Sequence, residues 1–151
     1  MRIVVSGPKA SGKTTVSRLL AERLGWDWYE TDAELERLYA EETGCQRSFR
    51  DIWRDLGEKA FRALERRAVE TIAAKETCVV GTGGSTLFDE TVRQRLCQGA
   101  FVVLVEAPFE VLWQRLQADG LPAYLRDEQT PRQAFATRVR RATQAVAEFA
   151  D

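Results

Sequence analysis

The sequence predicts one three-layer α/β domain, in which a parallel sheet is flanked by helices on both faces. Short β-branched segments alternate with segments of helical periodicity along the chain, which is typical of a parallel sheet covered by helices. A glycine-rich turn joins the first strand-like segment to the first helical one, an arrangement that binds phosphate groups. The 151 residues suit one domain with a sizeable core.

The first half of the chain is expected to begin with a buried parallel strand, because residues 2–6 read RIVVS. A helix follows at 13–24, with apolar residues on one face and Gly25 at its end. The apolar residues that we expect to face the core are Val16, Leu19, Leu20 and Leu24. The next elements are a strand at 26–30, a helix at 32–42 ending near Gly44, and a helical region at 49–75 broken near Gly57.

The second half continues the alternation. A buried strand at 77–82 runs into a second glycine-rich corner, GGS. The polar segment 119–131 contains Gly and Pro and is predicted to be a mobile loop. The other elements are a helix at 90–99, a strand at 100–107, and helices at 109–118 and 132–150.

Composition excludes several classes of protein. The formal net charge of −1 argues against binding nucleic acid or a membrane surface, which would need a basic excess, and no apolar run reaches the ~20 residues of a membrane span. Cys45, Cys78 and Cys97 share no metal-binding spacing and suit the reduced thiols of a cytoplasmic protein. The chain has no histidine, so a general base near neutral pH must be a carboxylate or a perturbed lysine.

The first glycine-rich turn matches the phosphate-binding pattern G-x-x-x-x-G-K-[ST] and has a strand before it and a helix after it. Lys13 is expected to reach the β- and γ-phosphates as a catalytic cation, and the Thr14 hydroxyl to bind Mg²⁺. The motif predicts a nucleoside triphosphate with Mg²⁺ and leaves the acceptor open. The residues assigned to the nucleotide here are Gly7, Pro8, Lys9, Ala10, Ser11, Gly12, Lys13, Thr14 and Thr15.

Two classes of function fit this motif: a small-molecule kinase, and a nucleotide-driven switch or motor. Switches and motors usually need a longer chain and a strand that ends in a metal-binding aspartate. The candidate strand here ends CVVGTGGS, with no acid. The short chain and the second glycine-rich corner therefore favour the kinase.

Residues 29–32 read YETD, at the point where a strand pattern gives way to a helical one. Asp32 is a helix cap, a solvated charge, or a group that contacts a reacting proton. Thr31 and Glu34 have the T-x-x-E spacing of a capping box, which would leave Asp32 in the first helical turn. The helix dipole favours its ionised form, so we expect a weak base that mainly orients a hydroxyl. Glu30 should point to the same side.

Four stretches of the chain resemble the shikimate kinase family. They are GPKASGKT, YETD (Asp-x-Asp in the family), IWRDLGEKAFRALE (close to I-F-x-x-x-G-E-x-x-F-R-x-x-E), and GTGGS (T-G-G-G in the family). The resemblance is close from Arg2 to about Glu106 and looser from there to Asp151.

The resemblance implies transfer of the γ-phosphate of ATP to the 3-hydroxyl of shikimate, giving shikimate 3-phosphate and ADP in aromatic amino-acid (chorismate) biosynthesis. It also implies a cytoplasmic monomer that binds a small molecule and neither nucleic acid nor membrane. Residues 1–151 would form one P-loop kinase domain, with a core at 1–31 and 76–118, a substrate-binding helical region at about 32–62, and a lid at about 119–131.

The resemblance also assigns roles to site residues. Asp32 would orient the 3-hydroxyl and accept its proton, and Glu30 would help Thr14 to hold Mg²⁺, through water. Gly83 and Gly84 would let the substrate approach the backbone closely, although a plain tight turn is the alternative.

Arg62 would bind the shikimate carboxylate in a bidentate manner. A pair with Glu58 or Glu65 within the helix is an alternative that can coexist with this role. Trp53 and Phe61 match aromatic residues that line the family's substrate pocket, and without the resemblance they would be taken as core residues.

The lid and the C-terminal region depart from the family pattern. Leu121 stands where the family has a phosphate-contacting lid arginine, with Arg126 nearby, and Ser85 replaces the third glycine of T-G-G-G. Arg115 matches a family arginine near adenine, or is a solvated helix residue. Arg141 is the nearest match to a second carboxylate-binding arginine; Arg138 and Arg140 are alternatives, as is a simple basic face.

The family's edge strand after the final Ala-Asp is missing from this sequence, either because the sequence is truncated at Asp151 or because the protein lacks the strand, and we expect weak ATP affinity for this exact chain. Because the lid and the last helix have diverged, and Leu121 and Ser85 depart from the family motifs, two other functions remain open. One is a kinase for another small hydroxylated acceptor, and the other is a nucleotide-binding relative with reduced or lost activity.

Overall fold

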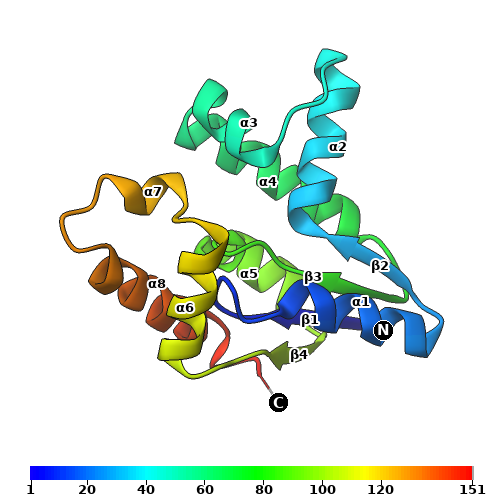
Figure 1. The fold of residues 1–151 in the computed structure, drawn as a ribbon. Coiled ribbons are helices and arrows are strands. Elements are labelled where there is room, and N and C mark those ends of the chain that lie inside the picture. The colour runs from blue at the N-terminus through cyan, green and yellow to red at the C-terminus, as the bar shows by residue number, and fades with distance from the viewer. Residues whose placement is uncertain (151) are drawn as a thin grey trace.

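A four-stranded parallel sheet lies at the centre of the computed structural model, which describes residues 1–150 (Figure 1). The strand order is β2-β3-β1-β4, and every pairing is parallel, with Val4 opposite both Val80 and Val102. The strands are β1 (Arg2–Ser6), β2 (Asp27–Glu30), β3 (Cys78–Gly81) and β4 (Phe101–Leu104). The predicted parallel sheet is confirmed.

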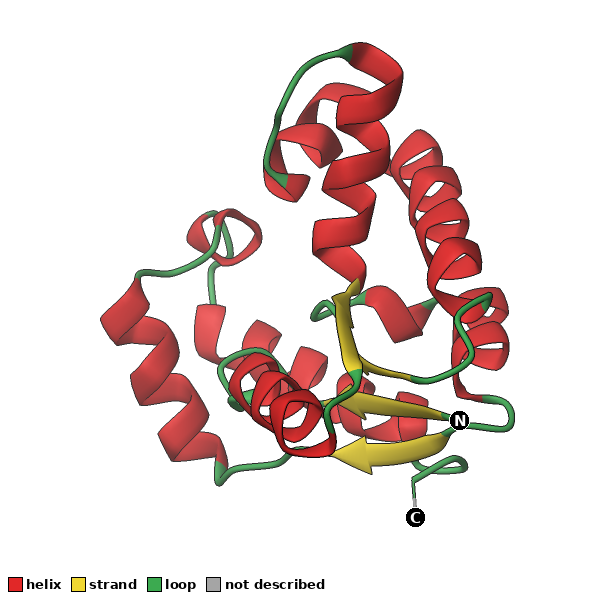
Figure 2. Cartoon of the chain, turned by 90° about the vertical axis from the view of Figure 1, so that its right-hand side faces the viewer, coloured by secondary structure: helices red, strands yellow, loops and turns green. Residues whose placement is uncertain are grey.

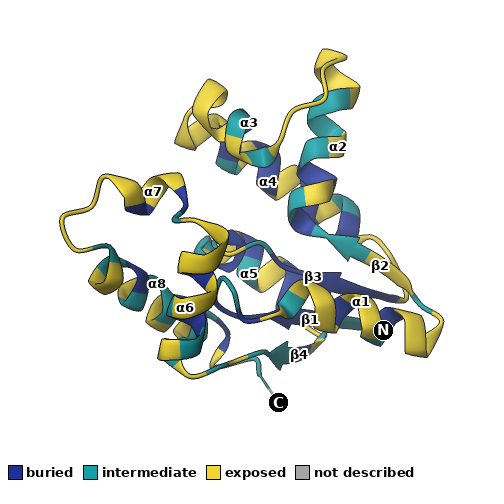
Figure 3. Cartoon of the chain, in the orientation of Figure 1, coloured by how far each residue is buried: buried dark blue, intermediate teal, exposed yellow. Residues whose placement is uncertain are grey.

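Alternate residues of the strands face opposite layers. Val4, Val80 and Val102 belong to a core with residues of α4 (Glu58–Ala73), α5 (Glu90–Cys97) and α8 (Pro131–Val146). Val5 and Val79 belong to a second core with α1 (Lys13–Leu24) on the other face. The central strands β1 and β3 are therefore largely buried between two helical layers, as predicted, because period-two alternation sends neighbouring valines to opposite sides, whereas the edge strands β2 and β4 are only partly buried (Figure 3).

The predicted apolar face of α1 is wrong in detail. Leu20 packs against the core as predicted, but Val16, Leu19 and Leu24 are 38%, 47% and 42% exposed, whereas Ser17 and Ala21 are buried. The helix lies so close to the sheet that a Cβ at Gly81 would be 2.8 Å from Ser17 Oγ. Small side chains occupy the contact face for this reason, and the larger ones lie at its margins or point away.

Two groups of helices extend from the core on the same side of the sheet (Figures 1 and 2). One group consists of α2 (Thr31–Thr43), α3 (Phe49–Leu56) and the start of α4, and it packs around Leu35, Ile52 and Leu64. Gly57, at a φ of 78°, ends α3 and precedes α4. The break predicted near this glycine is confirmed.

The second group contains the segment predicted to be a mobile loop. Residues Ala123–Arg126 form the short helix α7, between α6 (Phe109–Asp119) and α8. Leu125 is fully buried in a cluster with Leu112, Leu116 and Phe135. Part of the segment is therefore packed, because one apolar residue of the loop contributes to a core of its own.

The 3₁₀ helix η1 (Thr86–Phe88) follows β3, and the chain returns to the sheet after α8. Ala150 forms a parallel bridge with Val102 of the edge strand β4. Asp151 lies outside the described residues. Within residues 1–150, the helices fall short of the length and apolarity that a membrane crossing requires.

Candidate active site

The turn between β1 and α1 is shaped to enclose a ligand. A Cβ at Gly7 would lie 2.3 Å from the Val105 carbonyl oxygen, so only glycine fits there. Ala10 adopts a φ of 69°, a left-handed conformation that is uncommon for a residue with a side chain. Gly12, with a φ of 92°, precedes α1 and faces open space. Such alternating conformations turn successive backbone N–H groups inward and create an anion-binding concavity.

The side chains of this turn fit a phosphate chain. Ser11 Oγ is buried and has no hydrogen-bond partner among residues 1–150, which is unusual for a buried polar atom. Lys13 Nζ donates only a long bond to the Pro8 carbonyl, at 3.4 Å. Burial and the neighbouring charge of Lys9 lower the pKa of Lys13. An anion would give both groups a partner and would favour the charged form of the lysine.

The ends of β1 and β3 are joined by Thr82. Its N–H donates to the Val5 carbonyl at 3.1 Å, and its hydroxyl donates to Ser6 Oγ at 3.1 Å. The helices that follow these adjacent strands cover opposite faces of the sheet. Such a switch point is where open α/β sheets bind ligands, and it brings the phosphate turn beside the Gly83-Gly84 corner.

Asp32 lies against this corner. A Cβ at Gly83 would be 2.4 Å from Asp32 Oδ1 and 2.8 Å from Oδ2, so the glycine makes room for the carboxylate. Burial raises the pKa of Asp32 to about 6, although the Lys13 charge opposes the shift. The expectation of a weak base is therefore wrong, because burial raises the pKa, but a carboxyl with a pKa of about 6 is still mostly ionised at neutral pH, as expected. A carboxyl that titrates near pH 6 is a more effective general base.

The predicted capping box does not form. Thr31 is the first residue of α2 and is buried, and the preceding Glu30 makes no side-chain cap. Thr31 Oγ1 accepts a 2.8 Å hydrogen bond from the Gly83 N–H and lies 3.1 Å from Thr86 Oγ1. Glu34 binds Arg37 instead, at 2.7 Å. Thr31 thus fixes the glycine corner against α2, a role that its sequence spacing did not reveal.

Arg62 forms the helical pair with Glu65 that was one of the expected alternatives. Its Nη1 donates to Glu65 Oε1 at 2.7 Å, and its guanidinium lies 5.3 Å from the Trp53 ring and 5.9 Å from the Phe61 ring. Phe61 is a core residue at 4% exposure, whereas Trp53 is 38% exposed and free to line a pocket. Asp32 and Arg62 both act on the pKa of Glu65, which places the three groups in one region.

Glu65 is a site residue that sequence reasoning considered only as a helix partner. It is 2% exposed, and burial raises its pKa to about 7, with Arg62 opposing the shift. Its helical spacing to Arg62 was the available signal, but that spacing is common on surface helices. Only burial distinguishes this pair from a solvated one.

The proposed metal ligands face the phosphate turn. Glu30 ends β2, and its Oε1 would lie 3.3 Å from a Cβ at Gly81. Both Glu30 and Asp32 raise the pKa of Lys13, so both carboxylates lie near its ammonium. Thr14 is exposed in the first turn of α1. Residues 1–150 contain no cluster of three or more acidic, Cys or His side chains, so a cation here would have few protein ligands besides these two.

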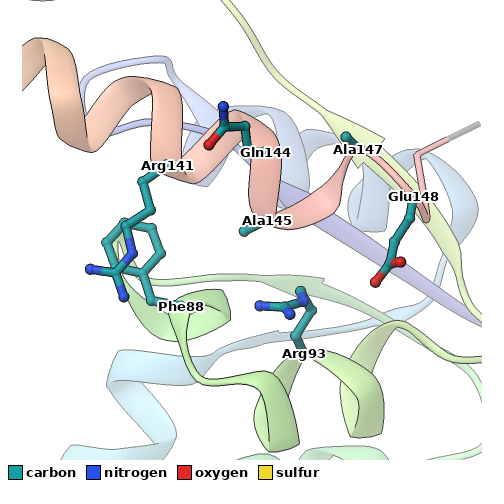
Figure 4. A pocket seen from close by; sticks show the side chains of 7 residues that line it. All are labelled: Phe88, Arg93, Arg141, Gln144, Ala145, Ala147 and Glu148. Carbon is teal, nitrogen blue, oxygen red and sulfur yellow. The ribbon is translucent and has the colours of Figure 1, made fainter.

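The two outlying arginines lie in different surroundings. Arg115, on α6, donates to the Ala10 carbonyl at 3.0 Å and so ties this helix to the phosphate turn. Arg141 is exposed and stacks on Phe88, with 4.2 Å between its guanidinium carbon and the ring centroid. Arg141, Phe88 and Arg93 line a cavity of about 390 Å³ at the side of α8 (Figure 4).

A family model described as shikimate kinase matches residues 9–150. The chain belongs to the shikimate kinase family. It is 34% identical over 117 residues to a shikimate kinase from Persephonella marina, covering 78% of this chain and 68% of that protein. It is 41% identical over 116 residues to one from Thermobifida fusca, covering 77% and 63%. The matched segment thus spans about two thirds of the relatives' length.

Solved shikimate kinases share the fold. The enzyme from Acinetobacter baumannii in complex with shikimate superimposes with a TM-score of 0.82 and 30% identity, over 99% of this chain and 79% of that chain. The one from Aquifex aeolicus gives 0.75 and 27%, over 95% and 82%. The P-loop α/β fold of the family is therefore confirmed for this chain.

One departure from the shikimate kinase motifs causes no strain. Ser85, at the position of the family's third glycine, has a φ of −123°, which any residue adopts. The lid departure is real, because Leu121 packs beside the apolar lid cluster and carries no charge. Arg126 is exposed, and its Nε donates to the Leu121 carbonyl at 2.8 Å.

Proposed function

We propose that this chain transfers the γ-phosphate of ATP to the 3-hydroxyl of shikimate, giving shikimate 3-phosphate and ADP. The observation that carries the proposal is the position of Asp32: its carboxylate packs on Gly83, near Lys13 and near the Arg62–Glu65 pair. The proximity of one carboxylate to the phosphate turn and to an arginine supports a site that brings a nucleotide and an acidic acceptor together. A relative of similar fold is described in complex with shikimate, which supports the choice of acceptor.

On the nucleotide side, the backbone N–H groups from Gly7 to Thr15 hold the phosphates, with Lys13 on the β- and γ-phosphates. Thr14 and Glu30 would hold Mg²⁺, which supplies charge neutralisation between the β- and γ-phosphates when it is bound. Arg115 fixes the phosphate turn through Ala10, and we assign the adenine to the same side.

On the acceptor side, Arg62 binds the shikimate carboxylate, and Glu65 keeps its guanidinium in place. Gly83 and Gly84 receive the ring hydroxyls, and Arg141 is our candidate for a second contact with the carboxylate. We assign substrate binding to the α2–α4 group and the lid to residues 119–131.

The chemical step is an in-line transfer. The 3-hydroxyl oxygen bonds to the γ-phosphorus as the bond from that phosphorus to the bridging oxygen breaks, ADP leaves, and Asp32 takes the hydroxyl proton. Such transfers have loose transition states, so positioning and charge neutralisation contribute more than base strength. We assign the protein to the cytoplasm and to aromatic amino-acid biosynthesis, as a monomer.

A coupled assay of ADP release, with and without shikimate, tests this function. We expect release that depends on shikimate and falls about 100-fold or more in Asp32→Asn, because the base is lost. ADP release that ignores shikimate but depends on another hydroxylated compound would indicate a different acceptor. Nucleotide binding without any acceptor-dependent release would indicate a relative that has lost activity, and the proposal would be wrong.

A further inference from the structure

The start of α3 is held by a carboxylate from another helix. Glu36, on α2, accepts a 3.0 Å hydrogen bond from the Phe49 N–H through its Oε1. Phe49 is the first residue of α3, so this N–H has no partner within its own helix. Ser48 Oγ caps the same end by accepting from the Asp51 N–H at 3.2 Å. One free donor of α3 is therefore satisfied by a neighbouring side chain and another by a residue of α2.

Glu36 supplies the polar contact between α2 and α3. The segment that joins the two helices, residues 44–48, is exposed along its whole length. Asp51 and Asp55 of α3 pair with arginines that lie at most eight positions away in the chain, so these pairs do not reach α2. Apolar packing between the helices involves Ile52. Without Glu36, this packing would be the contact that remains between α3 and α2 among residues 1–150.

The two carboxylates of α2 lie on one face of that helix. Asp32 and Glu36 are four residues apart, a spacing that places side chains one above the other. Asp32 packs on the Gly83 corner, and Glu36, one turn further along, holds α3. The same face of α2 therefore sets the position of α3 relative to the proposed base.

The α3 helix carries one wall of the proposed acceptor site. Trp53 of α3 meets the Phe61 ring edge-on, with 5.0 Å between the ring centroids and 67° between the ring planes. The guanidinium carbon of Arg62 lies 5.3 Å from the centroid of the Trp53 ring. A shift of α3 would move this ring and remove one of the contacts that orient Arg62. The start of α3 and the proposed carboxylate-binding arginine are therefore linked through the helix.

We propose that Glu36 is a positioning residue for the acceptor: it fixes α3 against α2 and thereby holds Trp53 beside Arg62. This inference rests on the kinase function proposed above, where Arg62 is assigned to the carboxylate of shikimate. Glu36 acts through α3 and not on the reacting atoms. When α3 is loosened, the fraction of molecules that can bind the acceptor falls, and the apparent affinity falls in proportion.

Amide hydrogen exchange of the full chain tests the attachment of α3 without any substrate. In Glu36→Ala, the amides of Phe49–Leu56 should exchange about fivefold faster or more, because a capping acceptor is lost. Glu36→Gln keeps a side-chain oxygen that can accept from the same N–H and should restore most of the protection. The control is Glu41→Ala, which removes an exposed carboxylate of α2 that pairs with Arg37 and should leave α3 unchanged. Parental exchange in a folded Glu36→Ala would overturn the proposal.

Steady-state kinetics test the link from α3 to the acceptor. The KM for shikimate should rise about tenfold in Glu36→Ala, because fewer molecules hold Arg62 in its binding orientation. The KM for ATP should stay within about twofold of the parent and kcat within about threefold, since the phosphate turn and the base are on other elements. Glu36→Gln should recover most of the affinity for shikimate, and Glu41→Ala should match the parent. Faster exchange of α3 with a parental KM for shikimate would refute the positioning role.

The parent chain distinguishes failure of this inference from failure of the kinase function. If ADP release by the parent does not depend on shikimate, the proposed function is wrong, and the acceptor role of Glu36 is wrong with it. If release by the parent depends on shikimate and Glu36→Ala keeps the parental KM, the function stands and this inference alone is wrong. Thermal melting of each variant establishes that it is folded.

Discussion

Single residues in this site are governed by competition between burial and nearby charge. Asp32 shows it most directly: burial raises its pKa, the Lys13 ammonium lowers it, and the outcome is about 6. Glu65, on α4, follows the same rule: burial raises its pKa, the charge of Arg62 opposes the shift, and the resulting pKa is about 7. Carboxylates therefore titrate in the range that histidine usually serves, in a chain that has no histidine.

The raised pKa of Asp32 predicts a stability change with pH. The folded protein holds the proton more tightly than the unfolded chain, so stability is lost as pH rises from about 4 to about 6 and stays lower above that. Asp32→Asn removes this cost and should increase the free energy of unfolding at pH 7.5 by about 1–3 kcal/mol. Near pH 4 it should change little. Urea unfolding at both pH values measures this.

Asp27→Asn, at the exposed start of β2, is the control for that experiment and should have little effect at either pH. Equal stability of the parent and Asp32→Asn at pH 7.5 would contradict the assigned cause. The same pKa places the acid limb of kcat/KM near pH 6, because the base must be ionised to accept a proton.

Gly83 and Gly84 are neighbours with different tolerance for a side chain. Gly83→Ala would place a methyl group 2.4 Å from Asp32 Oδ1, whereas a Cβ at Gly84 meets nothing within 4 Å. We expect Gly83→Ala to lower kcat/KM by about 100-fold, because displacement of a catalytic group by about 1 Å is costly. Gly84→Ala should retain far more activity, and equal effects would show that Asp32 is not held against Gly83.

At the level of elements, the junction of β2 and α2 organises the proposed acceptor side. Thr31 and Asp32 are consecutive at the start of α2, one turned to the Gly83 N–H and the other to the Gly83 Cα. One helical turn thus fixes both the corner and the base that serves it. The α4 helix does the same for Arg62 and Glu65, three residues apart on one face.

Thr31→Val tests this junction. The substitution keeps the shape but removes the acceptor of the Gly83 N–H and the partner of Thr86, so the unfolding free energy should fall by about 1–3 kcal/mol. The KM for shikimate should rise, since the corner loses its anchor. Thr31→Ser keeps the hydroxyl and should recover most of both, as chemical denaturation and kinetics would show. If valine and serine behave alike, the hydrogen bonds do not hold the corner.

On the scale of the whole molecule, the site lies where two helical groups meet the ends of β1 and β3. The α2–α4 group has its own core around Leu35 and Ile52, and the α6–α8 group has another around Leu112 and Phe135. Both groups also join the core of the sheet, through Val69 and Ile72 of α4 and Val146 of α8. Arg138 of this second group contacts the rings of both Tyr124 on α7 and Phe88 on η1.

The order of strands and helices was predictable because short-range physics determines it. Valine-rich runs extend, helical periodicity follows each run, and Gly25, Gly44 and Gly57 mark helix ends at positive φ. The phosphate turn was predictable too, because local steric constraints on its backbone require glycines. The exposed side of α1 was not predictable from the sequence, because the distance between this helix and the sheet depends on the partner strand as well as on the helix.

The sequence by itself determined the layers, the phosphate turn, and the residue types from which a histidine-free kinase site could be built. Tertiary structure alone decided that Thr31 holds Gly83 rather than capping α2, that Asp32 titrates near pH 6, and that Arg138 rests on Tyr124. The physical reason is common to all three. Burial and contact between residues far apart in the chain set these properties, and spacing along the sequence does not encode how closely distant segments approach.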